Sequence, residues 1–233
     1  MKAKTMRPVT MMNRRFPGPV ALGLTLSWVF SWALFWALFL PLPARAADEA
    51  PDALIRRLST TVLDAVKADQ AIRSGNLEPL IALVNKTVMP HVNFRRMTAA
   101  AVGPGWRQAT PGQQKRLQEE FKLLLVRTYA GALAHISEQT IQVKPLRAAA
   151  SDKDVLVRTE IVGRGDPIQL DYRLEKTPGD GAGWKVYNLN VLGVWLVETY
   201  RGQFAQQINA KGVDGLIDTL AARNKANAAA KGE

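Results

Sequence analysis

The sequence contains no cysteine among its 233 residues. A disulfide framework, a zinc–thiolate site and a cysteine nucleophile are therefore excluded. The long apolar run near the N-terminus is likewise not followed by a cysteine, which excludes a lipid-anchored lipoprotein. The lack of cysteine does not by itself assign a compartment.

Histidine is almost as scarce. Only His91 and His135 occur, and neither has metal-ligand spacing or a place in a nucleophile motif. The glycine-rich stretch 179–183 joins two strand-like runs instead of opening a helix, so it does not indicate a phosphate-binding loop. We therefore expect no catalytic residues, no metal and no cofactor.

The chain also lacks a concentrated basic patch, although its formal net charge is +11. Six basic residues and no acidic ones lie in residues 1–46, which leaves 25 basic and 20 acidic residues, a net of +5, in the remainder. The basic residues are scattered without interleaved aromatic residues, so nucleic acid is not an expected partner. A modest positive charge suits anionic membrane surfaces or an acidic partner, or simply a mildly basic soluble protein.

Residues 1–46 have the layout of a secretory signal peptide. A basic start is followed by the apolar run 20–40 and by Ala44-Arg45-Ala46, a small-residue cleavage site. The run of 21 residues is also long enough to span a bilayer as a retained anchor. We expect cleavage after Ala46, because Pro41 and Pro43 interrupt the helix before the site. Either outcome exports the rest of the chain.

The exported part begins and ends with helical patterns. Helical periodicity or capping residues predict helices over residues 51–69, 77–90, 91–103 and 111–136, and two more after residue 193. Thr110 and Pro111 are typical of a helix start, and the helix that follows carries a wide apolar face. The last residues, 226–233, are expected to form a disordered tail.

Between these helices the periodicity changes to that of β-strands. Four runs, beginning near residues 140, 153, 166 and 183, are separated by short turns, which indicates an antiparallel meander. Alternation places Tyr172 and Leu174 on the inner side of their strand, with Asp171 outward on the polar side. The fold class is therefore α+β: a curved four-stranded antiparallel sheet packed by helices, in one domain over residues 47–225.

Large aromatic residues concentrate around this sheet and the helices that flank it. Taken singly, each fits an ordinary core. Taken together, they fit a second arrangement, in which helices on a curved sheet leave a deep apolar cavity that holds a hydrophobic ligand.

Two segments resemble a known family. Residues 92–133 contain the spaced pattern G-x-x-W, T-P-x-Q, F and R-T-Y, and residues 184–220 contain W-x-V-Y, G-V, Y-R-x-Q-F and G-x-D-G-L-I. Both are similar to the MlaC family, the toluene-tolerance auxiliary components of ABC transporters. Three positions differ from the expected pattern: Asn93 and Asn188 stand in place of Asp, and Trp195 in place of Ser.

The resemblance implies a periplasmic phospholipid-binding shuttle in a Gram-negative bacterium. Its implied partners are phospholipid, an inner-membrane MCE-domain protein of an ABC transporter and an outer-membrane lipoprotein/porin complex, and its role is to maintain outer-membrane lipid asymmetry. We expect a monomer. The residues expected to contact lipid are Phe94, Met97, Phe121, Leu125, Tyr129, Val157, Ile161, Leu170, Tyr172, Trp184, Val186, Trp195, Val197 and Tyr200.

Two other functions remain open at this stage. One is a small enzyme on a cone-shaped α+β fold that uses a carboxylate such as Asp171 on an apolar substrate. The other is a periplasmic adaptor whose apolar patch binds protein and not lipid. Arg201 is a candidate for contact with a head group or partner, although a solvated arginine explains it equally well.

Overall fold

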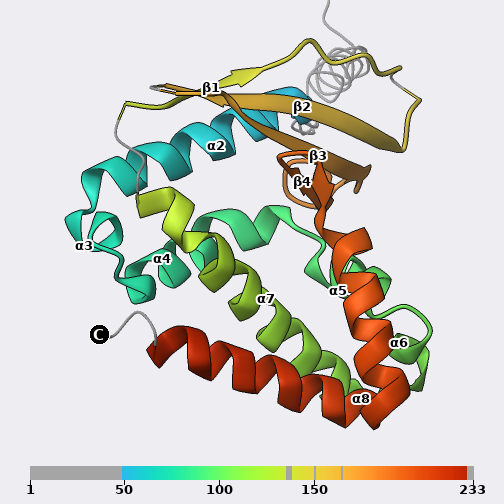
Figure 1. Cartoon of the computed structure of the whole chain (residues 1–233). Coiled ribbons are helices and arrows are strands. Elements are labelled where there is room, and N and C mark those ends of the chain that lie inside the picture. Colours follow the sequence, from blue (N-terminus) through green and yellow to red (C-terminus); the bar gives the residue numbers. More distant parts are fainter. Residues whose placement is uncertain (1–48, 135–137, 150, 164, 230–233) are drawn as a thin grey trace, which may run out of the picture. The chain divides into compact units, whose positions relative to one another are not determined.

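A computed structural model describes residues 49–134, 138–149, 151–163 and 165–229 (Figure 1). The expected signal peptide therefore lies outside the described residues. Within these ranges no helix combines the length and the hydropathy needed to cross a bilayer.

Three helices open the described chain, and local capping sets their limits. α2 (Pro51–Ala68) has proline at its first position and ends at Asp69. The Asp69 carboxylate then accepts the backbone N–H groups of Ala71 and Ile72, which starts α3 (Gln70–Arg73). α4 (Leu77–Leu83) begins in the same way, with Asn76 accepting the N–H of Glu78.

The helix expected over residues 77–90 changes type before it ends. After α4 the chain forms a π-helical turn, η1 (Val84–Val88), and a 3-10 turn, η2 (Met89–His91). Asn93 then caps α5 (Phe94–Val102), which is followed by the short α6 (Gly105–Gln108) and the long α7 (Pro111–Ala134). The helix expected from residue 91 therefore starts three residues later, because the Asn93 side chain accepts the N–H of Arg96.

The sheet is an open antiparallel meander of five strands in the order β1-β2-β3-β4-β5. The four expected strands are confirmed: β1 (Thr140–Val143), β2 (Asp154–Val162), β3 (Ile168–Lys176) and β4 (Trp184–Val191). β5 (Val194–Trp195) is an addition, formed because a tight turn at Leu192 and Gly193 folds the chain back onto β4. The prediction of α+β class is thus correct, and the strand count was one too low.

One side of the sheet is apolar and faces the helices, as Figure 1 shows for α2. Val155, Val157 and Leu174 of this inner side pack against Leu54 and Ile55 of α2. Alternate residues of each strand lie on this side of the sheet. The pairing of β3 with β4 shifts register once, between Arg173 and Leu174. Helices α5, α6, α7 and α8 form a second apolar layer of their own.

α8 (Leu196–Ala229) is one element with a break in the middle. Gly212 has φ 69° and ψ −174°, so the two C-terminal helices expected from the sequence are present and meet at this residue. The second half packs on α7, where Leu216, Ile217 and Leu220 are buried. Residues 226–229, which were expected to belong to a disordered tail, are part of this helix.

The break at Gly212 makes a first testable prediction. Its backbone conformation is close to one that only glycine adopts readily, and a Cβ placed there would meet no atom within 4 Å. Gly212→Ala should therefore lower the free energy of unfolding by about 1–3 kcal/mol through backbone strain alone. Urea denaturation measures the change.

Gly202 of the same helix offers a matched control. A Cβ placed at Gly202 would also meet open space, but this residue is not among the glycines with positive φ. Gly202→Ala should therefore stabilise the protein by about 0.5–1 kcal/mol. Equal effects at the two positions would contradict the role assigned to the Gly212 backbone.

Candidate functional site

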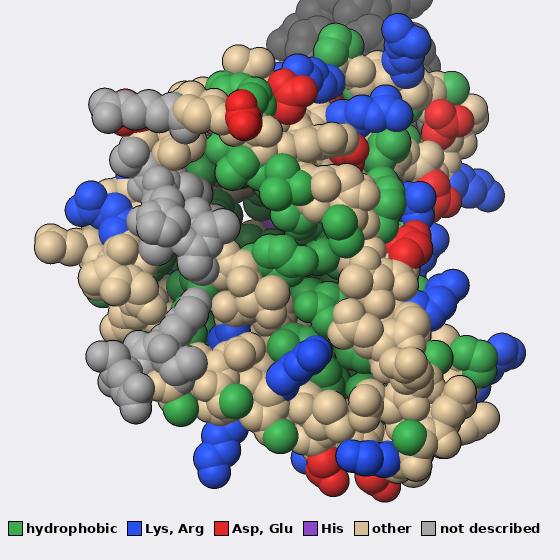
Figure 2. All heavy atoms as spheres, in the orientation of Figure 1, with side chains coloured by type: hydrophobic (Ala, Val, Ile, Leu, Met, Phe, Trp, Pro, Cys, Tyr) green, Lys and Arg blue, Asp and Glu red, His purple; other side chains and the backbone are tan. Residues whose placement is uncertain are grey.

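The apolar residues of the described chain form three clusters and not one continuous core. The sheet cluster joins α2 to the inner side of the sheet, and the helical cluster joins α5, α6, α7 and α8. A third cluster contains Leu63, Val66, Ile72, Leu80 and Ala130, from α2, α3, α4 and α7. Figure 2 shows that the face of the molecule is hollowed between α2, α7 and the sheet, and that hydrophobic side chains gather around the hollow.

Part of the inner side of the sheet is not covered by the helices. Ile161, Leu170 and Tyr172 point to the same side as the buried Val157, yet each remains partly exposed. In a compact domain, central strand residues on a helix-covered face are normally buried. Their exposure is consistent with an apolar wall that borders an open space.

Tyr172 places a hydroxyl group within this apolar wall. Burial raises the pKa of Tyr172 above its ordinary value, while hydrogen bonds with Ser59 of α2 and Thr159 of β2 act in the opposite direction. The Thr159 hydroxyl itself donates to the carbonyl of Leu170, at 2.7 Å. The phenol is therefore neutral at physiological pH, and its hydroxyl group is hydrogen-bonded to one side chain of α2 and one of β2.

Half of the predicted lipid contacts lie in or against the helical cluster. Phe121 is fully buried, with its ring centroid 5.7 Å from that of Phe94, 5.0 Å from that of Tyr200 and 5.2 Å from that of Phe204. Leu125 and Tyr129, one and two turns further along α7, are only partly buried. The members of this group are Phe94, Met97, Phe121, Leu125, Tyr129, Val197 and Tyr200.

A second group of predicted contacts belongs to the sheet cluster. Val157, Trp184 and Val186 are buried there, with Tyr172 packed against them. Sequence reasoning did not assign Leu54, Ile55 and Leu58 of α2 to the site, although they form the opposite side of this cluster. The helical periodicity of residues 51–69 was the signal that could have identified them.

Trp195 lies apart from the other predicted contacts. Its Cα partner in β4 is Asn190, whose own partner in β3 is Asp171, so Trp195 lies on the outer side of the sheet. There the guanidinium of Arg173 sits 4.2 Å from the centre of the indole ring. The structure does not bring Trp195 together with the inner wall.

The structure buries Asp171, although alternation places it on the polar side of its strand. Its side chain is on the outer side as predicted, but it is only 5% exposed, and one carboxylate oxygen accepts a hydrogen bond from Gln169 at 2.7 Å. It points away from the wall that contains Tyr172.

Among the described residues, no three histidine or acidic side chains are grouped so that they could hold a metal ion.

Asn93 and Asn188, the two departures from the family pattern, each donate to a carboxylate. The Asn93 amide donates to Glu175 at 2.6 Å, and the Asn188 amide donates to Glu198 at 2.8 Å. An ionised aspartate could not donate in either place and would repel the glutamate. The two asparagines therefore match the glutamates that this chain has opposite them.

The Asn188 contact also anchors the start of α8. Its carbonyl oxygen accepts the N–H of Val197, at 3.2 Å. Although burial acts to raise the pKa of Glu198, hydrogen bonds from Asn188 and Arg173, together with the charge of Arg173, hold it below its ordinary value. Glu198 is therefore ionised at neutral pH and ties α8 to β3 and β4.

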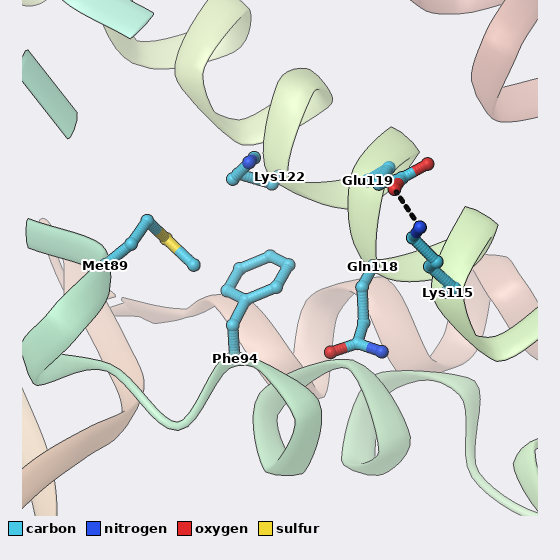
Figure 3. A pocket seen from close by; sticks show the side chains of 6 residues that line it. All are labelled: Met89, Phe94, Lys115, Gln118, Glu119 and Lys122. Atoms are coloured by element: carbon cyan, nitrogen blue, oxygen red, sulfur yellow. Dashed lines mark ion pairs between the residues drawn. The ribbon is translucent and has the colours of Figure 1, made fainter. Parts of the chain in front are cut away.

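A separate pocket of about 230 Å³ lies between η2, α5 and α7 (Figure 3). Met89 and Phe94 provide its apolar side, and Lys115 and Lys122 lie on α7 beside it. Its volume is below the roughly 300–1,000 Å³ of typical ligand pockets. Phe94, a predicted lipid contact, thus faces this pocket as well as the helical cluster.

The family model described as "MlaC protein" matches residues 56–222. The chain belongs to the MlaC family. The matched range includes α3 to α7, the whole sheet and most of α2 and α8, so the family assignment made from residues 92–133 and 184–220 is confirmed.

Three proteins similar to this chain have names that state a function or a ligand. The chain is 30% identical over 176 residues to toluene tolerance protein ttg2D of Pseudomonas putida, covering 74% of this chain and 80% of the relative. It is 24% identical over 176 residues to the intermembrane phospholipid transport system binding protein MlaC of Haemophilus influenzae, covering 75% and 82%. The phospholipid-binding protein of Ralstonia solanacearum, solved in complex with a phospholipid, is 47% identical with a TM-score of 0.72, covering 76% of this chain and 98% of that one.

Proposed function

We propose that this MlaC-family protein is a phospholipid carrier that holds acyl chains between the sheet and the helices. The main support is the 47% identical protein from Ralstonia solanacearum, whose structure contains a bound phospholipid. The uncovered apolar wall on β2 and β3 and the hollow beside it provide a place for such a ligand in this chain. The family is one of lipid-binding transport proteins, which argues against an enzyme.

The proposed lipid contacts are those predicted residues that remain partly exposed. They lie either on the inner side of the sheet or on α7. These are Leu125, Tyr129, Ile161, Leu170 and Tyr172. The fully buried members of the set, such as Phe121 and Val157, pack against other side chains of the protein and are not assigned to the lining. Trp195 is outside the proposed lining.

Burial of acyl chains determines how such a carrier works. Two chains contain on the order of 30 methylene groups, and at about 0.8 kcal/mol each their removal from water is worth roughly 20–25 kcal/mol. Release into water is therefore negligible. Transfer from the carrier to a bilayer is nearly neutral, because both interiors are apolar, so lipid must move while the carrier is docked to a partner.

We infer from the family that the docking partners are an inner-membrane MCE-domain protein of an ABC transporter and an outer-membrane lipoprotein/porin complex. The protein would act as a monomer in the periplasm, after export by the leader of residues 1–46, and would maintain outer-membrane lipid asymmetry. A carrier that moves lipid between environments of nearly equal free energy needs no chemistry of its own. The direction of lipid transport must therefore come from the partners, for example from ATP hydrolysis at the inner membrane. A protein-binding adaptor is the remaining alternative.

The test is direct. The protein exported with its own leader is purified from the periplasm without detergent and extracted with organic solvent, and the extract is analysed by mass spectrometry. We expect about one phospholipid per protein molecule, because release into water is negligible. Repeated preparations without phospholipid, from protein that also fails to take up lipid from vesicles, would refute the carrier proposal and favour the adaptor.

A further inference from the structure

The large hydrophobic side chains that are exposed in the described part of the chain gather at one end of the sheet. They are Ile168, Leu192 and Val194, which are 36%, 64% and 48% exposed. Ile168 begins β3, and the other two lie on either side of Gly193 in the β4–β5 turn. The N–H of Leu192 donates to the carbonyl of Gln169 at 3.0 Å, which holds the turn beside the start of β3. We call these three residues the apolar rim.

Leu192 occupies a backbone conformation that its side chain disfavours. Its φ is +52° and that of Gly193 is +87°, and no other non-glycine residue of the described ranges has positive φ. Two-residue turns of this kind favour Asn-Gly, because asparagine tolerates the left-handed region better than leucine does. The side chain is also mostly in water, so neither local backbone preference nor packing within the chain explains a leucine at this position.

The apolar rim continues the inner wall of the sheet. Ile168 is the Cα partner of Ile161, and Val191 is the partner of both Leu170 and Val194, so all five side chains share the inner side. Figure 2 shows hydrophobic side chains spreading from the hollow over the end of the sheet from which α8 starts. An apolar surface therefore runs without interruption from the wall to the solvent.

We propose that the apolar rim is the portal through which the acyl chains of the phospholipid enter and leave. The inference rests on the proposed function, since it concerns the route to the same site. Residues 189–195 contain no charged side chain, and Arg173, which contacts Trp195, lies on the outer side of the sheet, so the inner side of this end suits hydrocarbon. A chain that slides out along Leu170 and Val191 meets Val194, Leu192 and Ile168 before it meets water.

Transfer kinetics test the proposal. Protein loaded with a fluorescent phosphatidylethanolamine is mixed with unlabelled phosphatidylcholine vesicles, and the transfer rate is measured alongside the lipid content at equilibrium. Leu192→Asn removes the apolar contact while it relieves the backbone. We expect a transfer rate lower by roughly tenfold, with unchanged lipid content and equal or higher thermal stability.

Two further variants make the result specific. Leu192→Met keeps an apolar side chain and the unfavourable backbone, so its rate should stay within about twofold of the original. Ile168→Thr preserves β-branching in β3 but weakens the apolar rim, and it should slow transfer as Leu192→Asn does. Loaded Leu192→Asn and Ile168→Thr proteins that transfer lipid at the original rate would overturn the portal proposal alone. Original protein that takes up no lipid would overturn the carrier proposal and the portal with it.

Discussion

Phe121→Ala should lower the free energy of unfolding by about 3–5 kcal/mol, the largest stability effect that we expect from a single substitution in this protein. Phe121 has no exposed surface. Its ring makes edge-on contacts with Tyr200 and Phe204, at interplanar angles of 72° and 77°, and a tilted contact with Phe94 at 37°. Alanine removes these contacts and leaves a cavity that the surrounding helices cannot close.

Chemical denaturation measures this effect, and Phe121→Leu is the matched control. Leucine refills most of the space, so its cost should be clearly smaller, about 1–2 kcal/mol. Phospholipid content is a second readout, because Phe121 is assigned to the core and not to the lipid contacts. Folded Phe121→Ala protein should therefore keep its phospholipid. A loss of lipid with little loss of stability would reverse that assignment and place Phe121 in the lining.

Leu170→Asp should reduce co-purified phospholipid by at least about tenfold, the largest effect that we expect on binding. Leu170 lies between Thr159 of β2 and Val191 of β4 on the inner side, where the proposed acyl chains contact the wall. An ionised carboxylate there loses its water when lipid binds, which penalises the loaded state. Because Leu170 is partly exposed without ligand, the carboxylate keeps some hydration and the protein should still fold.

The readout is phospholipid per protein by mass spectrometry, with circular dichroism to confirm the fold. Thr140→Asp introduces the same charge at an exposed strand position on β1, and it should leave lipid content unchanged. A folded Leu170→Asp protein with full lipid content would remove Leu170 from the lining. An equal loss in both variants would indicate a general effect of charge and not a contact with lipid.

Local patterns were sufficient for much of the fold. Alternation in residues 168–176 predicted β3 and the shared side of Tyr172 and Leu174, because a strand turns successive side chains to opposite faces. The capping role of Asn76 also follows from residue type, since a side-chain acceptor satisfies backbone N–H groups at the start of a helix. β5 was missed because two residues carry no periodic signal.

The candidate site was less predictable, and Phe121, Leu170 and Trp195 illustrate why. All three are large apolar residues near the sheet, and local sequence gives them the same interpretation. The structure places Phe121 inside an aromatic cluster, Leu170 on a partly uncovered wall and Trp195 on the outer side under Arg173. These differences depend on packing between elements that are far apart in the chain.

The sequence by itself determined the α+β class, the order of the first four strands and, through residues 92–133 and 184–220, membership of the MlaC family. These properties depend on periodicity, turns and spaced motifs, which act over short stretches of chain. Only the tertiary structure decided which apolar side chains are enclosed and which border open space, and that three exposed ones meet at one end of the sheet. Exposure depends on what other elements cover a residue, and a linear pattern does not contain that information.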